Sequence, residues 1–149
     1  MINLLLVEDD DPKLDQVVYF LENLPSQLQV TVAKSLNSAC NLIDREYFDI
    51  ILLDMSLPTF DGRKTAGSNG RQKTFGGKEV LMYLWELEID TPVYVITGFK
   101  DFPGEFGQVL LPQLHAELTD EFPANYKGNI YFTHSSDDWK LQLRNLLEK

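Results

Sequence analysis

The chain has 149 residues, of which 44% are hydrophobic, and carries one cysteine and a formal net charge of −10. This length predicts one globular domain spanning residues 1–149, and the apolar runs are all too short to span a membrane as a helix. The acidic excess argues against nucleic acid and anionic membrane surfaces as partners, because both demand Lys and Arg. The single cysteine excludes an internal disulfide, and the first residues do not resemble a secretory signal, so we expect a cytoplasmic protein.

Apolar runs typical of buried strands alternate with apolar stripes at helical spacing, which favours a doubly wound α/β domain. The predicted strands lie at about 2–7, 28–32, 48–53, 93–96 and 129–133. The predicted helices begin at the caps Asp11, Ser35 and Asp137, near Lys78, and around Leu110, where Pro112 either interrupts a helix or starts one. Cys40 falls on the stripe of the second helix, which predicts a buried thiol.

Two segments break this periodicity. Residues 61–77 form a polar, turn-rich insertion, and residues 99–128 form an enlarged connection between the last two predicted strands. The charged residues of the insertion after Asp61 are basic; they are Arg63, Lys64, Arg71, Lys73. Two interpretations remain open for this insertion: it is a mobile surface loop, or it covers a crevice or contacts an acidic partner.

Acidic residues directly follow two of the apolar runs. Glu8 and Asp9 come after the first predicted strand, and Asp54 comes after the third. Because parallel strands end at one edge of a sheet, we expect these three carboxylates to meet in a crevice. Crowded like charges are costly unless a cation joins them, and carboxylate oxygens suit Mg²⁺.

These residues carry a resemblance to a known family. The motifs are, in chain order, Leu5-Leu6-Val7-Glu8-Asp9-Asp10, Asp54-Met55-Ser56-Leu57-Pro58, and Thr97-Gly98. The chain is similar over nearly its whole length to the receiver domain of bacterial response regulators. The resemblance implies a flavodoxin-like (βα)5 three-layer sandwich with the parallel strand order 2-1-3-4-5.

The resemblance also implies a site. Asp54 would be the phospho-acceptor, and Glu8, Asp9, Asp54 and the backbone carbonyl of Ser56 would hold Mg²⁺. The Thr97 hydroxyl would donate to a phosphoryl oxygen and, with Tyr131 as the aromatic partner, would act as the switch. In the family a lysine followed by a cis-proline ends the last strand, and here those positions are His134 and Ser135.

Three functions follow as hypotheses. The leading one is a stand-alone phosphorelay receiver that takes a phosphoryl group from a histidine kinase or phosphotransfer protein and signals by contact with a downstream protein. The second is a pseudo-receiver that binds partners without phosphorylation, which the replacement of lysine by His134 favours. The third is an aspartyl phosphatase, which needs an acid two residues after Asp54; that position is Ser56, so we do not expect an enzyme. The oligomeric state, a homodimer included, stays open.

Overall fold

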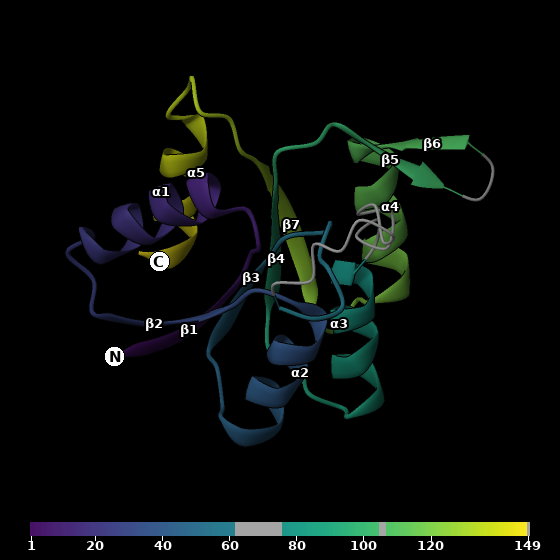
Figure 1. Cartoon of the computed structure of the whole chain (residues 1–149), viewed down its shortest axis with the longest axis horizontal. Helices are drawn as coiled ribbons and strands as arrows, with labels where there is room; N and C mark the ends of the chain where they lie inside the picture. The colour runs from purple at the N-terminus through teal and green to yellow at the C-terminus, as the bar shows by residue number, and fades with distance from the viewer. Residues whose placement is uncertain (62–75, 105–106, 149) are drawn as a thin grey trace.

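The computed structural model describes residues 1–61, 76–104 and 107–148 (Figure 1). Within these ranges the strands are β1 (Ile2–Val7), β2 (Leu28–Ala33), β3 (Ile50–Leu53), β4 (Val93–Thr97), β5 (Asp101–Gly104), β6 (Gly107–Leu110) and β7 (Tyr126–Tyr131). The helices are α1 (Asp11–Glu22), α2 (Leu36–Arg45), α3 (Gly76–Glu86), α4 (Leu111–Glu121) and α5 (Asp138–Leu147). None of the helices in the described ranges has the length and apolar composition needed to cross a membrane.

One parallel sheet organises the chain, with the strand order β2-β1-β3-β4-β7. Val7 at the end of β1 lies opposite Leu53 at the end of β3, and Leu53 lies opposite Val95 of β4. The α/β fold class and the predicted order are therefore confirmed, with β7 taking the place of the fifth strand. This register brings the residues that follow β1 and β3 to the same edge of the sheet.

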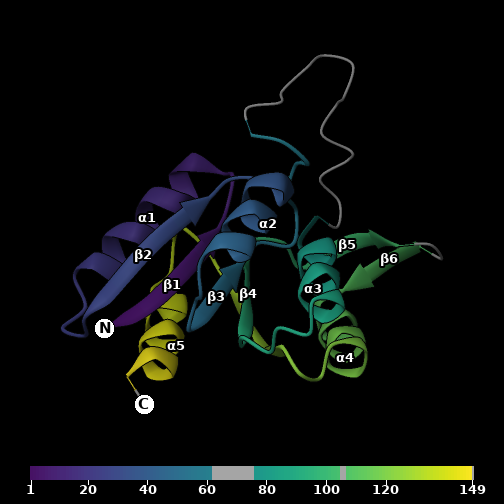
Figure 2. The same ribbon diagram turned by 90° about the horizontal axis from the view of Figure 1, so that it is seen from below.

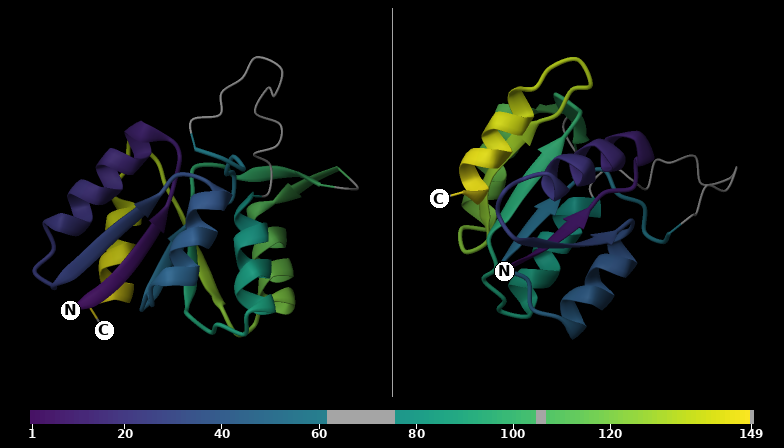
Figure 3. Two further views of the ribbon diagram at one scale, coloured as in Figure 1. Left: turned by 60° about the horizontal axis from the view of Figure 1, so that its bottom comes forward. Right: turned by 90° about the vertical axis from the view of Figure 1, so that its left-hand side faces the viewer.

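Helices cover both faces of the sheet and complete the three layers (Figures 2 and 3). Helices α1 and α5 pack on one face, where their buried side chains form a core with strand residues; the helical members include Leu14, Val17, Leu21, Trp139, Leu143. Helices α2, α3 and α4 pack on the other face through Ala39, Ile43, Val80, Leu81, Leu84, Leu114, Leu118. Because both faces are covered, the central strands β1 and β3 are almost wholly apolar.

The helix starts agree with the sequence to within two residues. Ser35 caps α2 as predicted, and its Oγ accepts from the backbone N–H of Ser38 at 3.1 Å. Helix α1 begins at Asp11, so that Asp10 and not Asp11 is its cap residue, and α3 begins at Gly76, before Lys78. Pro112 lies in the first turn of α4, where its missing N–H costs nothing, so it starts a helix and does not interrupt one.

The enlarged connection from 99 to 128 contains an element that the sequence did not predict. Strands β5 and β6 pair antiparallel as a separate hairpin, which lies beside α4 at one end of the molecule (Figures 1 and 2). The side chain of Phe102 in β5 is buried in the core, and this anchors the hairpin to the domain. The last strand of the sheet begins at Tyr126, three residues before its predicted start, because Tyr126 pairs with Val93.

Two further predictions meet the structure only in part. Cys40 is half-buried on α2 and not fully enclosed. Most of the predicted 61–77 insertion lies outside the described residues, including all four of its basic side chains. Its described ends are Asp61, whose Oδ1 accepts from the Ser38 hydroxyl at 3.0 Å, and the first two residues of α3.

Candidate phosphorylation and metal site

The carboxyl ends of β1 and β3 place Glu8 and Asp54 next to each other. The backbone N–H of Asp54 donates to the carbonyl of Val7 at 2.9 Å, so the ladder between the two strands continues to the acceptor residue. Glu8 and Asp54 are almost fully buried, whereas Asp9 is partly exposed. One carboxylate oxygen from each of these three residues lies within 4.8 Å of the others. The predicted meeting of the three acids is therefore present in the structure.

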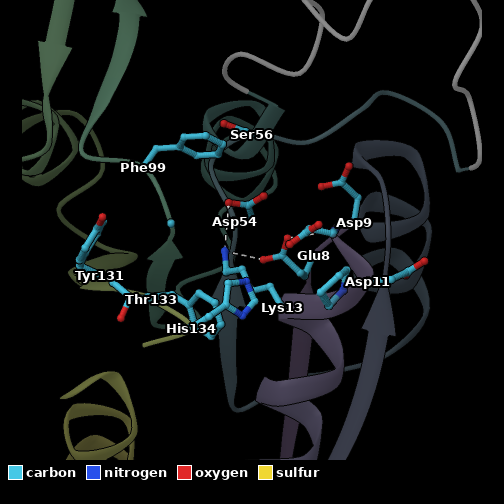
Figure 4. A pocket seen from close by; sticks show the side chains of 14 residues that line it. Glu8, Asp9, Asp11, Lys13, Asp54, Ser56, Phe99, Tyr131, Thr133 and His134 are labelled. Atoms are coloured by element: carbon cyan, nitrogen blue, oxygen red, sulfur yellow. Dashed lines mark hydrogen bonds and ion pairs between the residues drawn. The ribbon is translucent and has the colours of Figure 1, made fainter. Parts of the chain in front are cut away.

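These acids lie in an open cavity of about 610 Å³ (Figure 4). Its wall is formed by the first turn of α1 and by the residues that follow β1, β3, β4 and β7. The carboxylates lie at the carboxyl edge of the sheet, where open α/β sheets bind ligands. Ser56 and Gly98 line the same cavity, so a small ligand at Asp54 would contact several strand ends at once.

Burial and mutual repulsion shift the titration of both buried acids. Burial, followed by the charge of Asp54, raises the pKa of Glu8 to about 8, against the opposing effect of Lys13. Burial also raises the pKa of Asp54, again opposed first by Lys13. Two buried carboxyls this close cannot both hold a negative charge cheaply, so a cation at this place is strongly favoured.

Lys13 is a side chain of this site that the sequence analysis missed. Its Nζ lies 2.6 Å from Oε1 of Glu8 and 3.4 Å from Oδ1 of Asp54, and it donates to the carbonyl of Ile96 at 2.7 Å. Figure 4 shows the side chain pointing from α1 between the two carboxylates. A signal was present: Lys13 precedes Val17 by four residues, which puts a charged residue on the buried stripe of α1.

The donor set fits a hard divalent cation. All three acids offer oxygen ligands, which Mg²⁺ prefers, and an open cavity leaves room for the waters that Mg²⁺ retains. Oε1 of Glu8 is buried without a well-oriented hydrogen-bond donor in the described part of the chain. When all three acids are ionised, three carboxylates and one ammonium leave two negative charges, which a single divalent cation balances.

The predicted switch residues lie beside this cavity. Thr97 is fully buried at the end of β4, and its Oγ1 accepts from the backbone N–H of Phe99 at 3.1 Å. Tyr131 lies opposite Thr97 in the sheet register and lines the cavity, with Nζ of Lys100 5.1 Å from the centre of its ring. This placement suits the predicted roles, which stay predictions, as does the role of the Ser56 carbonyl.

His134, at the position of the family's lysine, lies on the rim of the cavity. Its side chain is exposed, and Nδ1 lies 2.6 Å from Nε2 of Gln16 on α1. Its ring stacks edge-on against Phe132, with 4.9 Å between ring centres. These contacts hold the imidazole against α1, and a direct role at the phosphoryl group stays a prediction.

Comparison with known proteins places this site in context. A family model described as "Response regulator receiver domain" matches residues 4–68, the part that carries the three acids. The Detocs response regulatory protein DtcB of Enterobacter cloacae is 31% identical over 96 residues, which are 64% of each chain. The uncharacterized protein y4jR of Sinorhizobium fredii is 28% identical over 142 residues, 95% of this chain and 93% of that protein.

One similar solved structure contains a metal ion. The receiver domain of the sensor histidine kinase PA1611 from Pseudomonas aeruginosa has a magnesium ion coordinated in its active site cleft. It superposes with a TM-score of 0.61 at 18% identity, covering 99% of this chain and 94% of that one. At this identity the likeness shows the fold, which is that of the receiver domains.

Proposed function

We propose that Asp54 of this chain, whose residues 4–68 match the response regulator receiver domain, accepts a phosphoryl group from a histidine kinase or a phosphotransfer protein. A receiver domain is a signalling module and not an enzyme in its own right. The observation that carries the proposal is the position of Asp54, at the floor of an open cavity with Glu8 and Asp9 within ligand distance. That a relative of this chain is named a response regulatory protein supports it.

In phosphoryl transfer to Asp54, the protein would contribute mainly the position of the acceptor and the neutralisation of charge. A carboxylate oxygen of Asp54 attacks phosphorus, and the bond from phosphorus to the leaving nitrogen of a phosphohistidine breaks. The nitrogen keeps the bonding electron pair, and the new bond leaves an acyl phosphate on Asp54. Burial at the end of β3 fixes the acceptor against rotation, which is the kind of positioning that accelerates phosphoryl transfer.

The carboxylates of Glu8, Asp9 and Asp54, with the carbonyl of Ser56, would hold Mg²⁺. The ion would neutralise the charge on the phosphoryl oxygens as they approach an acidic site. Glu8 must lose its proton to act as a ligand, and its raised pKa makes that loss part of metal binding.

The proposed output is contact with a downstream protein in the cytoplasm. Thr97 and Tyr131 lie opposite each other in the register of β4 and β7, and Tyr131 lines the cavity that contains Asp54. A phosphoryl group on Asp54 would offer the Thr97 hydroxyl a stronger acceptor than any neutral group, because hydrogen bonds to charged oxygens are about twice as strong. A shift of Thr97 would free space beside Tyr131.

Intact mass spectrometry after incubation with acetyl phosphate and Mg²⁺ tests the proposal. We expect a mass gain of one phosphoryl group, abolished in Asp54→Asn and retained in Asp15→Asn, which removes an exposed acid of α1. If neither acetyl phosphate nor a phosphorylated histidine donor produces this mass gain, the proposal is refuted. The pseudo-receiver that only binds partners would then be the better interpretation.

A further inference from the structure

The ammonium of Lys13 is buried beside Asp54, unlike that of a lysine on the protein surface. Only 5% of its side chain is exposed, and its partners are Glu8, Asp54 and the carbonyl of Ile96. Nζ donates hydrogen bonds to Oδ1 of Asp54 and to the carbonyl of Ile96, and it lies 2.6 Å from Oε1 of Glu8 as an ion pair. Phe132 closes a further side, with its ring centre 5.8 Å from Nζ. The charge is therefore directed at the acceptor and at the metal ligand beside it.

Burying a lysine this completely is costly, because the ammonium loses its contact with water. Position 13 lies on the apolar stripe of α1, among side chains that pack into the core. The lysine there offsets the repulsion between the buried carboxyls of Glu8 and Asp54. It thereby places a positive charge 3.4 Å from Oδ1 of Asp54.

Phosphorylation would increase the need for that charge. A phosphoryl group on Asp54 brings further negative oxygens to a place that already holds the carboxylates of Glu8 and Asp9. Among the described residues that line the cavity, Lys13 is the one lysine or arginine. His134 lines it too, but it is exposed and its Nδ1 is engaged by Gln16.

We propose that Lys13 pairs with the phosphoryl group during its transfer to Asp54 and in the phosphorylated product. On this proposal the first turn of α1 supplies the cation that would otherwise come from the end of β7, where this chain has His134. The inference rests on the proposed function, because it names a further residue at the same site. Lys13 reaches Asp54 without rearrangement of the backbone, since Nζ already contacts the acceptor.

The test compares the rate of mass gain with acetyl phosphate and saturating Mg²⁺ in the wild type and in variants. Lys13→Met keeps about the same side-chain length and removes the charge. If this variant does not fold, Lys13→Gln replaces it, because glutamine removes the charge but keeps two N–H donors. Lys34→Met is the matched control, because it removes a lysine that pairs with Asp11 at the exposed rim. We expect the Lys13 variants to be about 10²-fold slower, the loss typical of one charge-stabilising donor, and the control to stay within about twofold of the wild type.

Two further measurements separate this role from a structural one. Lys13→Met should bind Mg²⁺ at least as tightly as the wild type by calorimetry, because the ammonium no longer competes for Glu8 and Asp54. In Lys13→Met combined with His134→Lys, a lysine at the end of β7 should recover at least a tenth of the lost rate, and no recovery would overturn the equivalence of the two positions. A wild-type rate in Lys13→Met would overturn the role of Lys13 and leave Asp54 as the acceptor. No phosphorylation of the wild type would overturn both proposals.

Discussion

Gly77 is a position where the structure leaves no room for an added methyl group. It is the second residue of α3, and its backbone N–H donates to the carbonyl of Met55 at 3.0 Å. A Cβ at this position would lie 2.5 Å from the carbonyl oxygen of Asp54 and 2.8 Å from Cα of Met55. These are backbone atoms, so no side-chain rotation relieves the contact.

The cost follows from these distances. Carbon atoms pack at about 3.5 to 4.0 Å, so α3 must move away from the end of β3 by about 1 Å. Forced overpacking costs about 1–3 kcal/mol, and we expect the upper end because both faces of the contact are rigid. Alanine regains about 1 kcal/mol of helix propensity over glycine. The net loss of about 2 kcal/mol corresponds to a fall in Tm of about 4–8 °C for a chain of this size.

Urea unfolding followed by circular dichroism measures the effect, with Gly98→Ala as the matched control. A Cβ at Gly98 would lie 3.7 Å from the carbonyl oxygen of Phe132, an ordinary contact, so its free energy of unfolding should change by less than about 0.5 kcal/mol. If Gly77→Ala unfolds at the same urea concentration as Gly98→Ala, the close approach of α3 to the acceptor strand is refuted.

Three further results are expected. Because its pKa is raised to about 8, Glu8 is protonated and a poor ligand at pH 6; Mg²⁺ affinity measured by calorimetry should rise up to pH 8, and a flat profile would contradict this. Burial, and then two nearby carboxylates, raise the pKa of Cys40 to about 11, so alkylation by iodoacetamide should still accelerate between pH 9 and 10 and not level off. Asn125→Ala removes an amide that donates to two main-chain carbonyls and should cost about 1–3 kcal/mol in urea unfolding; a loss no larger than that of exposed Asn41→Ala would contradict it.

The hairpin shows why one element escaped prediction. Strand β5 is four residues long and contains a proline and a glycine, so it lacks the alternation that reveals a longer strand. Its pairing with β6 and the burial of Phe102 depend on the core formed with α3 and α4, which are distant or later in the chain. Local pattern carries no information on such contacts.

The carboxylate site was predictable because it follows from two local features and one general rule. The apolar runs before Glu8 and Asp54 mark buried strands, and parallel strands end at one edge, so their next residues must meet. Residue type and chain position were sufficient for this step, whereas the strand order was implied by the family resemblance.

The placement of the positive charge was decided by tertiary structure. Which acceptors a lysine reaches depends on how α1 lies across the sheet, and this angle is set by the packing of Val17 and Leu21 against the core. The family resemblance placed a cationic residue at the end of β7, where this chain has His134. The ammonium beside Asp54 comes instead from Lys13, which precedes Asp54 by 41 residues. Acids at strand ends are positioned by backbone pairing, whereas a long side chain on a helix is positioned by the packing of the whole domain.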